Sequence, residues 1–194
     1  IATSAKLEVG HPPGAPLFQM LGAFAAMFAI SPDKIAAMVN WVSALSSAFA
    51  VLFMFWSATN ILMKVVKIGT EKLSNHTVIA VLGSCLIGAL TFTFSDTFWF
   101  SAVETEVYAM ATFMLALLLW LGLRWIDAID EPRGNKWLLL ISLVVGMSFG
   151  VHFMALLAIP SIGYLYFFKK YPKVTLKNFI IANIAVVAVL LVVF

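Results

Sequence analysis

The chain is built from apolar runs of membrane length that are separated by short polar stretches. A helix that crosses a bilayer needs about 20 predominantly apolar residues, and residues 35–63, 77–95 and 106–126 each meet that need. Hydrophobic residues make up 63% of the chain, charged residues make up 11%, and the mean hydropathy is +1.04. These values exclude an ordinary soluble domain and predict an all-α fold, that of a polytopic helical membrane protein.

A further apolar run, residues 137–168, is too long for a single crossing. As one helix its 32 residues would measure about 48 Å, whereas the hydrocarbon core of a bilayer is about 30 Å thick. We therefore expect two short spans, 137–151 and 153–168, that meet beside Gly150. With residues 178–194, the transmembrane core then has about six spans.

The charges of the loops predict the direction of these spans. Lys and Arg collect in cytoplasmic loops, and residues 64–76, 124–136 and 169–177 are all rich in them. Residues 96–105 carry acids alone and are expected on the opposite, outer side. With two short spans between 137 and 168, His152 lies at an outer turn.

The apolar residues 13–30 allow two arrangements. They follow Pro12 and Pro13, and proline favours the first turn of a helix. The segment is either a full span that comes from the cytoplasm or a helix that lies on the outer membrane surface. The surface helix would place His11 on the same side as His152.

The chain divides into two parts on this interpretation. Residues 1–34 are expected to be part of the first outer loop with its surface helix, and residues 35–194 to be the transmembrane core. The chain begins with Ile1 rather than Met and ends at Phe194 inside an apolar run. We therefore expect it to be truncated at both ends.

The candidate functional residues are the polar ones beside the apolar runs, because ionisable groups are costly at a bilayer. They are His11, Glu104, Glu106, Tyr108 and His152. Imidazole titrates near neutrality and suits a donor or a general base. Plainer interpretations are a polar cap at His11, a solvated helix start at the glutamates and packing at His152. On one helix, Glu104 and Glu106 would point to nearly opposite sides, and Glu104 and Tyr108 would share a face.

Other classes of function leave no motif in the sequence. There is no Walker loop, no GxGxxG, no HExxH and no Cys/His spacing of a metal site, so no metal ligand is predicted. The net charge of +3 comes from loops beside apolar spans, where it indicates topology rather than nucleic-acid binding.

Three motifs follow one another along nearly the whole chain. They are Gly10-His11-Pro12-Pro13-Gly14-Ala15-Pro16-Leu17 followed by Pro32-Asp33, then Trp99 with Ala102-Val103-Glu104-Thr105-Glu106-Val107-Tyr108, then Gly146 with Gly150-Val151-His152 and Pro160. Together they resemble the membrane O-mannosyltransferase-like proteins of the glycosyltransferase C superfamily. The His-Pro-Pro segment is the most specific of the three, because protein mannosyltransferases carry a similar segment in their first outer loop.

The resemblance implies a multi-helix membrane core and a reaction on its outer or luminal side. A sugar, with mannose expected, passes from a polyprenyl-phosphate carrier to a protein hydroxyl with inversion. The catalytic carboxylate is expected shortly before the His-Pro-Pro segment, which here means before Ile1, and Glu8 does not match its position. The chain alone is therefore expected to be inactive. The substrate-binding residues implied are His11, Pro12, Pro13, Glu104, Glu106, Tyr108 and His152.

The expected function is thus an integral-membrane glycosyltransferase of a bacterial inner membrane or of the endoplasmic reticulum. Its expected partners are the lipid-linked sugar donor, a protein acceptor and membrane lipids, without nucleic acid. No cofactor is indicated besides the donor substrate, and the need for a divalent metal is left open. The alternatives are a transporter or channel subunit whose intramembrane acids line a pathway, and a purely structural membrane subunit.

Overall fold

The computed structural model describes residues 1–10, 14–67 and 73–193, and in this part of the chain it contains helices and no strand. The predicted all-α class is therefore confirmed. The elements are α1 (Ala2–Lys6), α2 (Pro16–Ala26), the 3-10 helix η1 (Pro32–Lys34), α3 (Ile35–Val66), α4 (Asn75–Thr93), α5 (Asp96–Val103), α6 (Val107–Ala128), α7 (Lys136–Ser148), the 3-10 helix η2 (Phe153–Leu157), α8 (Ala158–Lys170) and α9 (Leu176–Val193).

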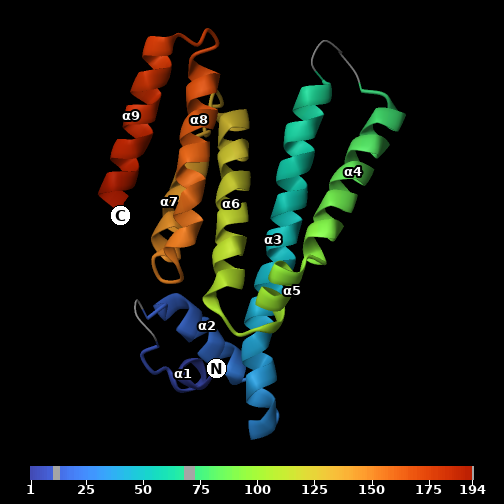
Figure 1. Ribbon diagram of the computed structural model, residues 1–194, viewed down its shortest axis with the longest axis vertical. Coiled ribbons are helices and arrows are strands. Elements are labelled where there is room, and N and C mark those ends of the chain that lie inside the picture. Colours follow the sequence, from blue (N-terminus) through green and yellow to red (C-terminus); the bar gives the residue numbers. More distant parts are fainter. Residues whose placement is uncertain (11–13, 68–72, 194) are drawn as a thin grey trace.

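The longer helices run roughly along one axis (Figure 1). Within the described residues, Pro32–Val66, α4 and α6 are long and apolar enough to cross a membrane, whereas α2, α7 and α9 are apolar but shorter. Residues 137–168 are not one helix, because α7 ends before the turn at Gly150 and η2 and α8 follow it. The number of crossings, six in the sequence analysis, stays a prediction.

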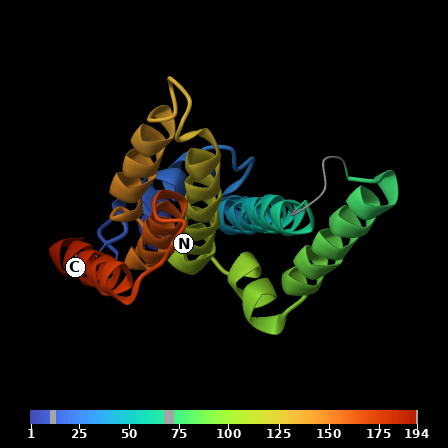
Figure 2. The same ribbon diagram turned by 90° about the horizontal axis from the view of Figure 1, so that it is seen from above.

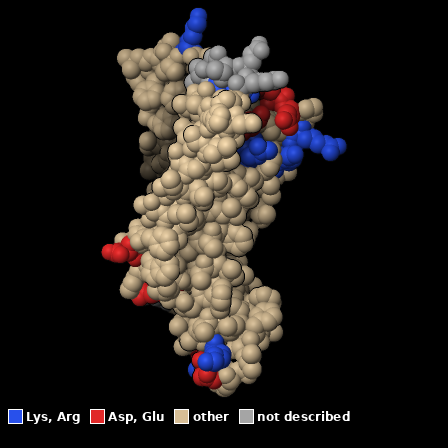
Figure 3. All heavy atoms as spheres, turned by 90° about the vertical axis from the view of Figure 1, so that its right-hand side faces the viewer, with Lys and Arg blue, Asp and Glu red and all other residues tan. Residues whose placement is uncertain are grey.

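The distribution of charge fits a membrane protein. On the face shown in Figure 3, charged side chains of both signs gather at the upper end and others lie in the lower part. The band between them shows no Lys, Arg, Asp or Glu. Such a band is the surface that a bilayer core requires, because charges inside it are costly.

The packing of α3 against α6 forms the centre of the molecule. Along α3 the buried positions carry mostly small side chains, among them Ser43, Ser46, Ser47 and Ser57. Small side chains let two helix backbones approach closely where no water drives helices together. α4 packs against α3 and α5 and stands apart from α7, α8 and α9 (Figure 2).

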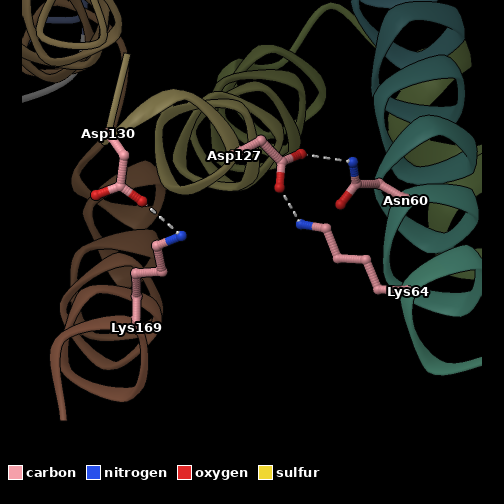
Figure 4. Close-up of polar contacts among 5 residues, drawn as sticks. All are labelled: Asn60, Lys64, Asp127, Asp130 and Lys169. Carbon is pink, nitrogen blue, oxygen red and sulfur yellow. Dashed lines mark hydrogen bonds and ion pairs between the residues drawn. The ribbon is translucent and has the colours of Figure 1, made fainter. Parts of the chain in front are cut away.

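Ion pairs join three helices at the upper end of Figure 1, beside the connections that the sequence analysis assigns to the cytoplasm. Asp127, in the last turn of α6, pairs with Lys64 and accepts a hydrogen bond of 3.0 Å from Asn60, both on α3 (Figure 4). Asp130 pairs with Lys169 of α8 at 2.9 Å (Figure 4). The described parts of the three basic connections therefore share one end of the molecule, although the membrane side of that end stays a prediction.

The opposite end carries α1, α2, α5 and η1 (Figure 1). α2 has 11 residues, or about 16 Å of helix, which is too short to cross a bilayer. This length favours the surface helix for residues 13–30, and the choice between the two arrangements stays a prediction. The close approach of α1, α2 and α3 occurs at Gly22, where a Cβ would lie 2.7 Å from the Cβ of Ser4.

Asp33, in η1 at this end, has an exposed side chain. The Ser31 hydroxyl and the Lys34 ammonium, 3.3 Å away, lower the pKa of its carboxyl group. A carboxyl group with a lowered pKa stabilises the fold above its ordinary pKa, and that contribution is lost as the pH falls through the lowered value. Because the group is exposed, the contribution is small.

Candidate functional site

A cavity of about 440 Å³ lies at the end of the bundle that carries α1 and α2. Four parts of the chain line it: the N-terminal segment, the start of α2, the α5–α6 connection and the turn before η2. Its lining residues are Ile1, Thr3, Ser4, Gly10, Gly14, Ala15, Phe18, Gln19, Thr105, Glu106, Val107, Tyr108, Val151 and His152. Three of the seven residues expected to bind substrate, Glu106, Tyr108 and His152, therefore meet in one cavity.

The position of Glu106 follows from a break between α5 and α6. Glu104 ends α5 in an extended conformation, and Glu106 caps the start of α6, also extended. α3 holds this break from the side, because Ser43 donates to the Glu106 carbonyl at 3.4 Å and Thr105 donates to the Asn40 side chain at 3.3 Å. The glutamate side chain is thereby presented at the mouth of the cavity, where it is exposed.

The same break corrects one expectation from the sequence. Glu104 and Tyr108 do not share a helix face, because no helix is continuous from one to the other. Glu104 lines a neighbouring hollow together with Asn40 of α3, and Glu106 borders both hollows. Glu104 is therefore not brought together with His152.

His152 is held at the cavity by its own backbone turn. Its Nδ1 accepts a hydrogen bond of 3.0 Å from the Met154 N–H, which makes it the N-cap of η2. In a neutral imidazole with Nδ1 as acceptor, the proton is on Nε2. The ring lies beside that of Tyr108, with centroids 5.4 Å apart. The cavity thus receives an Nε2–H donor next to a phenol.

A contact with α2 fixes the turn that carries His152. The Leu17 N–H, at the start of α2, donates to the Gly150 carbonyl at 2.8 Å. A Cβ at Gly150 would lie 3.0 Å from the Cβ of Leu17, so glycine allows this approach. The two motifs around positions 10–17 and 146–152, far apart in sequence, therefore meet in space.

His11, Pro12 and Pro13 lie outside the described residues. Gly10 and Gly14, which flank them in the sequence, both line the cavity. Gly14 has a φ of 92°, in the left-handed region that glycine adopts readily. The expected role of the three residues in substrate binding stays a prediction.

Polar side chains from α1 and α2 also line the cavity, and the sequence did not point to them as site residues. Ser4 donates to the Gln19 side-chain oxygen at 2.5 Å, and the Gln19 amide donates to Thr3 at 3.4 Å. All three residues line the cavity. The signal that could have found Gln19 is that it is the one amide in the apolar residues 13–30.

The described lining of the cavity offers several kinds of hydrogen-bonding group. Among the described residues that line the cavity, Glu106 is the one carboxylate and His152 the one imidazole. No group of three His, Cys, Asp or Glu side chains in the described part of the chain could hold a metal ion. Hydroxyl, amide, carboxylate and imidazole groups around one space are able to bind the hydroxyls of a sugar and an anionic group.

Comparisons with known proteins agree on one family. The family described as the protein O-mannosyl-transferase TMEM260 N-terminal domain matches residues 1–175. A Dictyostelium discoideum protein named protein O-mannosyl-transferase tmem260 is 26% identical over 123 residues, which are 63% of this chain and 13% of that relative. The matched part is thus a small portion of the relative's length. No solved structure matches the chain. The chain belongs to the TMEM260 N-terminal domain family of protein O-mannosyl-transferases.

Proposed function

We propose that this chain is part of an integral-membrane glycosyltransferase that moves mannose from a polyprenyl phosphate to a protein hydroxyl. The observation that carries the proposal is the cavity that unites Glu106, Tyr108 and His152 in a chain of this family. The cavity lies at the end opposite the ion-paired basic end, which supports a site on the non-cytoplasmic face. The proposed location is the bacterial inner membrane or the membrane of the endoplasmic reticulum.

The proposed reaction is a single displacement at the sugar. The oxygen of an acceptor Ser or Thr hydroxyl attacks C1 of the mannose and forms the new C1–O bond. The bond from C1 to the phosphate oxygen breaks, and the polyprenyl phosphate leaves with the electron pair. The hydroxyl proton passes to a carboxylate that acts as the general base. Since the leaving phosphate is already ionised, it needs charge stabilisation more than protonation.

The cavity supplies groups for both ends of this displacement. His152 donates from Nε2 to an oxygen of the phosphate, because its Nδ1 is occupied by Met154. Glu106 and Tyr108 orient hydroxyls of the sugar or of the acceptor, and Gln19 adds an amide to the same wall. His11, with Pro12 and Pro13, is proposed as a second contact to the donor. Glu104 binds the acceptor from the neighbouring hollow.

The polyprenyl tail has a groove of its own in this proposal. A hollow of about 560 Å³ lies along α3, α6 and α8, and its lining is mostly apolar, with Met54, Leu115 and Leu157 among its residues. Moving a hydrocarbon tail from the lipid into an apolar groove changes its free energy little. The tail is therefore bound by a groove of fitting shape rather than by polar contacts. The partners are therefore the lipid-linked donor, a protein acceptor and the surrounding lipids.

The test is a transfer assay with the full-length protein in lipid vesicles. Radiolabelled mannose is offered either on a polyprenyl phosphate or on a nucleotide, together with a Ser/Thr-containing acceptor peptide. The proposal predicts label in the peptide from the lipid donor alone. Absence of transfer from every donor would overturn the proposal and favour the transporter or channel interpretation.

A further inference from the structure

A tryptophan at the basic end of the molecule holds two cations. The guanidinium carbon of Arg124 lies 5.5 Å from the ring centroid of Trp137, and the ammonium nitrogen of Lys136 lies 5.3 Å from it. Both distances are within the range of about 6 Å in which a cation is attracted to an aromatic ring. Arg124 lies near the end of α6 and Lys136 opens α7, so two helices contribute to the cluster.

Two of the three carboxylates near this turn are paired with lysines of other helices, and the third, Glu131, is exposed to solvent. Asp127 binds Lys64 and Asp130 binds Lys169, both on other helices (Figure 4). Among the described residues, neither Arg124 nor Lys136 has an ion pair. Two like charges beside one ring repel each other. An anion that contacts both would offset this repulsion.

The cluster is held in place before any ligand arrives. Trp137 packs edge-to-face on Trp120 of α6, with ring centroids 6.1 Å apart. The turn before it is tight, because a Cβ at Gly134 would lie 2.1 Å from the Ala128 carbonyl oxygen. This turn leads from the end of α6 to the start of α7, so that Arg124 and Lys136 both reach the Trp137 ring.

An apolar surface continues from the cations along α7. Leu139, Leu140 and Leu143 follow Trp137 on this helix and are exposed to 74%, 43% and 57%. A ligand at this place therefore meets two cations and an indole at one end and leucine side chains along its length. An anionic headgroup with acyl chains has this division, and a free phosphate or a soluble peptide does not.

We propose that Arg124 and Lys136, held against Trp137, bind the phosphate of an anionic phospholipid whose acyl chains lie along the exposed leucines of α7. The site is at the opposite end of the molecule from the cavity with His152, and the proposal does not depend on the transferase function. Tryptophan is enriched at membrane–water interfaces, and basic residues there attract anionic lipids. The lipid ties the α6–α7 turn to the cytoplasmic leaflet.

The test measures lipid binding to the purified full-length protein in detergent by native mass spectrometry. The probes are short-chain phosphatidylglycerol, short-chain phosphatidylcholine and inorganic phosphate. The wild type is expected to bind phosphatidylglycerol more tightly than phosphatidylcholine. The R124Q/K136Q double variant should lose about 30-fold in affinity for phosphatidylglycerol, from about 1 kcal/mol per cation at 1.4 kcal/mol per decade.

The matched control is K170Q/K173Q, which removes the same charge from exposed lysines at the end of α8 and after it. It should change the affinity less than about threefold, since these lysines lie on another connection and local contact, rather than total charge, sets the binding. Equal binding of the two lipids by the wild type would overturn the proposal. So would an equal loss in the control pair, or displacement of the lipid by inorganic phosphate at matching concentrations.

Discussion

At the scale of single residues, His152 has two tasks that can be separated. Its Nδ1 caps η2 through Met154, whereas its Nε2–H is free to serve the cavity. Asparagine is a good N-cap and its side-chain oxygen can accept the same N–H. His152→Asn therefore removes the imidazole donor and keeps the cap. His152→Ala would remove both.

We expect His152→Asn in the full-length enzyme to keep the wild-type melting temperature and to lose about 10- to 150-fold in transfer rate. That range corresponds to about 1.5–3 kcal/mol for a hydrogen bond to a charged group, at about 1.4 kcal/mol per decade. His76→Asn, at an exposed histidine of α4, is the control and should change neither quantity. Wild-type turnover in His152→Asn would show that the residue serves packing alone.

The sequence predicted some members of the cavity and not others for physical reasons. Glu106 and His152 were found because ionisable groups beside apolar runs are costly and therefore informative. The contacts that hold the connection between Glu104 and Glu106 were missed, because they are a hydrogen bond from Ser43 and one to Asn40, both on a distant helix. Gln19 was missed because a single amide in an apolar run is compatible with a plain surface helix.

At the scale of elements, the turn between α6 and α7 depends on Gly134. A Cβ there would lie 2.1 Å from a backbone oxygen, that of Ala128, so the backbone itself must move. We expect Gly134→Ala to lower the free energy of unfolding by about 1–3 kcal/mol, as overpacking does. Gly83→Ala is the control, since a Cβ at Gly83 of α4 meets no atom within 4 Å.

Thermal unfolding in detergent measures both glycine variants. Gly83→Ala should leave the melting temperature unchanged or raise it, because alanine is the better helix former by about 1 kcal/mol. Equal melting temperatures for Gly134→Ala and the wild type would mean that the turn is looser than the structure shows.

The ion pairs in Figure 4 should differ in their contributions. The Asp127 side chain is 30% exposed and has two partners, Lys64 and Asn60, whereas that of Asp130 is 82% exposed and pairs with Lys169. We expect Asp127→Asn to cost about 1 kcal/mol and Asp130→Asn to cost less than about 0.5 kcal/mol. Denaturant titration of each variant checks this order. Similar losses from the two substitutions would contradict it.

Which elements could be predicted from the sequence depended on their length. The long helices α3, α4 and α6 were predicted from continuous apolar runs. The split of residues 137–168 was predicted because this run is too long for a single crossing. α5 was not predicted, since its eight residues carry both aromatic and polar side chains in a stretch that was interpreted as loop. Short helices of this kind are stabilised by tertiary packing rather than by their own sequence.

At the scale of the whole molecule, the charges of the loops predict which end faces the cytoplasm. In a cysteine-free version of the full-length protein, Thr97→Cys on α5 and Lys173→Cys after α8 introduce single exposed thiols at opposite ends. An impermeant maleimide should label Thr97→Cys in intact cells or sealed luminal-side-out vesicles, and Lys173→Cys only after permeabilisation. The reverse pattern would invert the topology, because the basic loops would then lie outside.

If mannose is transferred in the cavity at Glu106, the full-length Glu106→Gln variant should be impaired in transfer. Its neutral side chain keeps the shape and removes the charged acceptor. Transfer of labelled mannose from a polyprenyl phosphate to an acceptor peptide is compared with the wild type and with Asp33→Asn, an exposed carboxylate at the same end that does not line the cavity. We expect a loss of about tenfold or more for Glu106→Gln and wild-type transfer for Asp33→Asn. Wild-type transfer by Glu106→Gln would show that mannose is not transferred at this cavity.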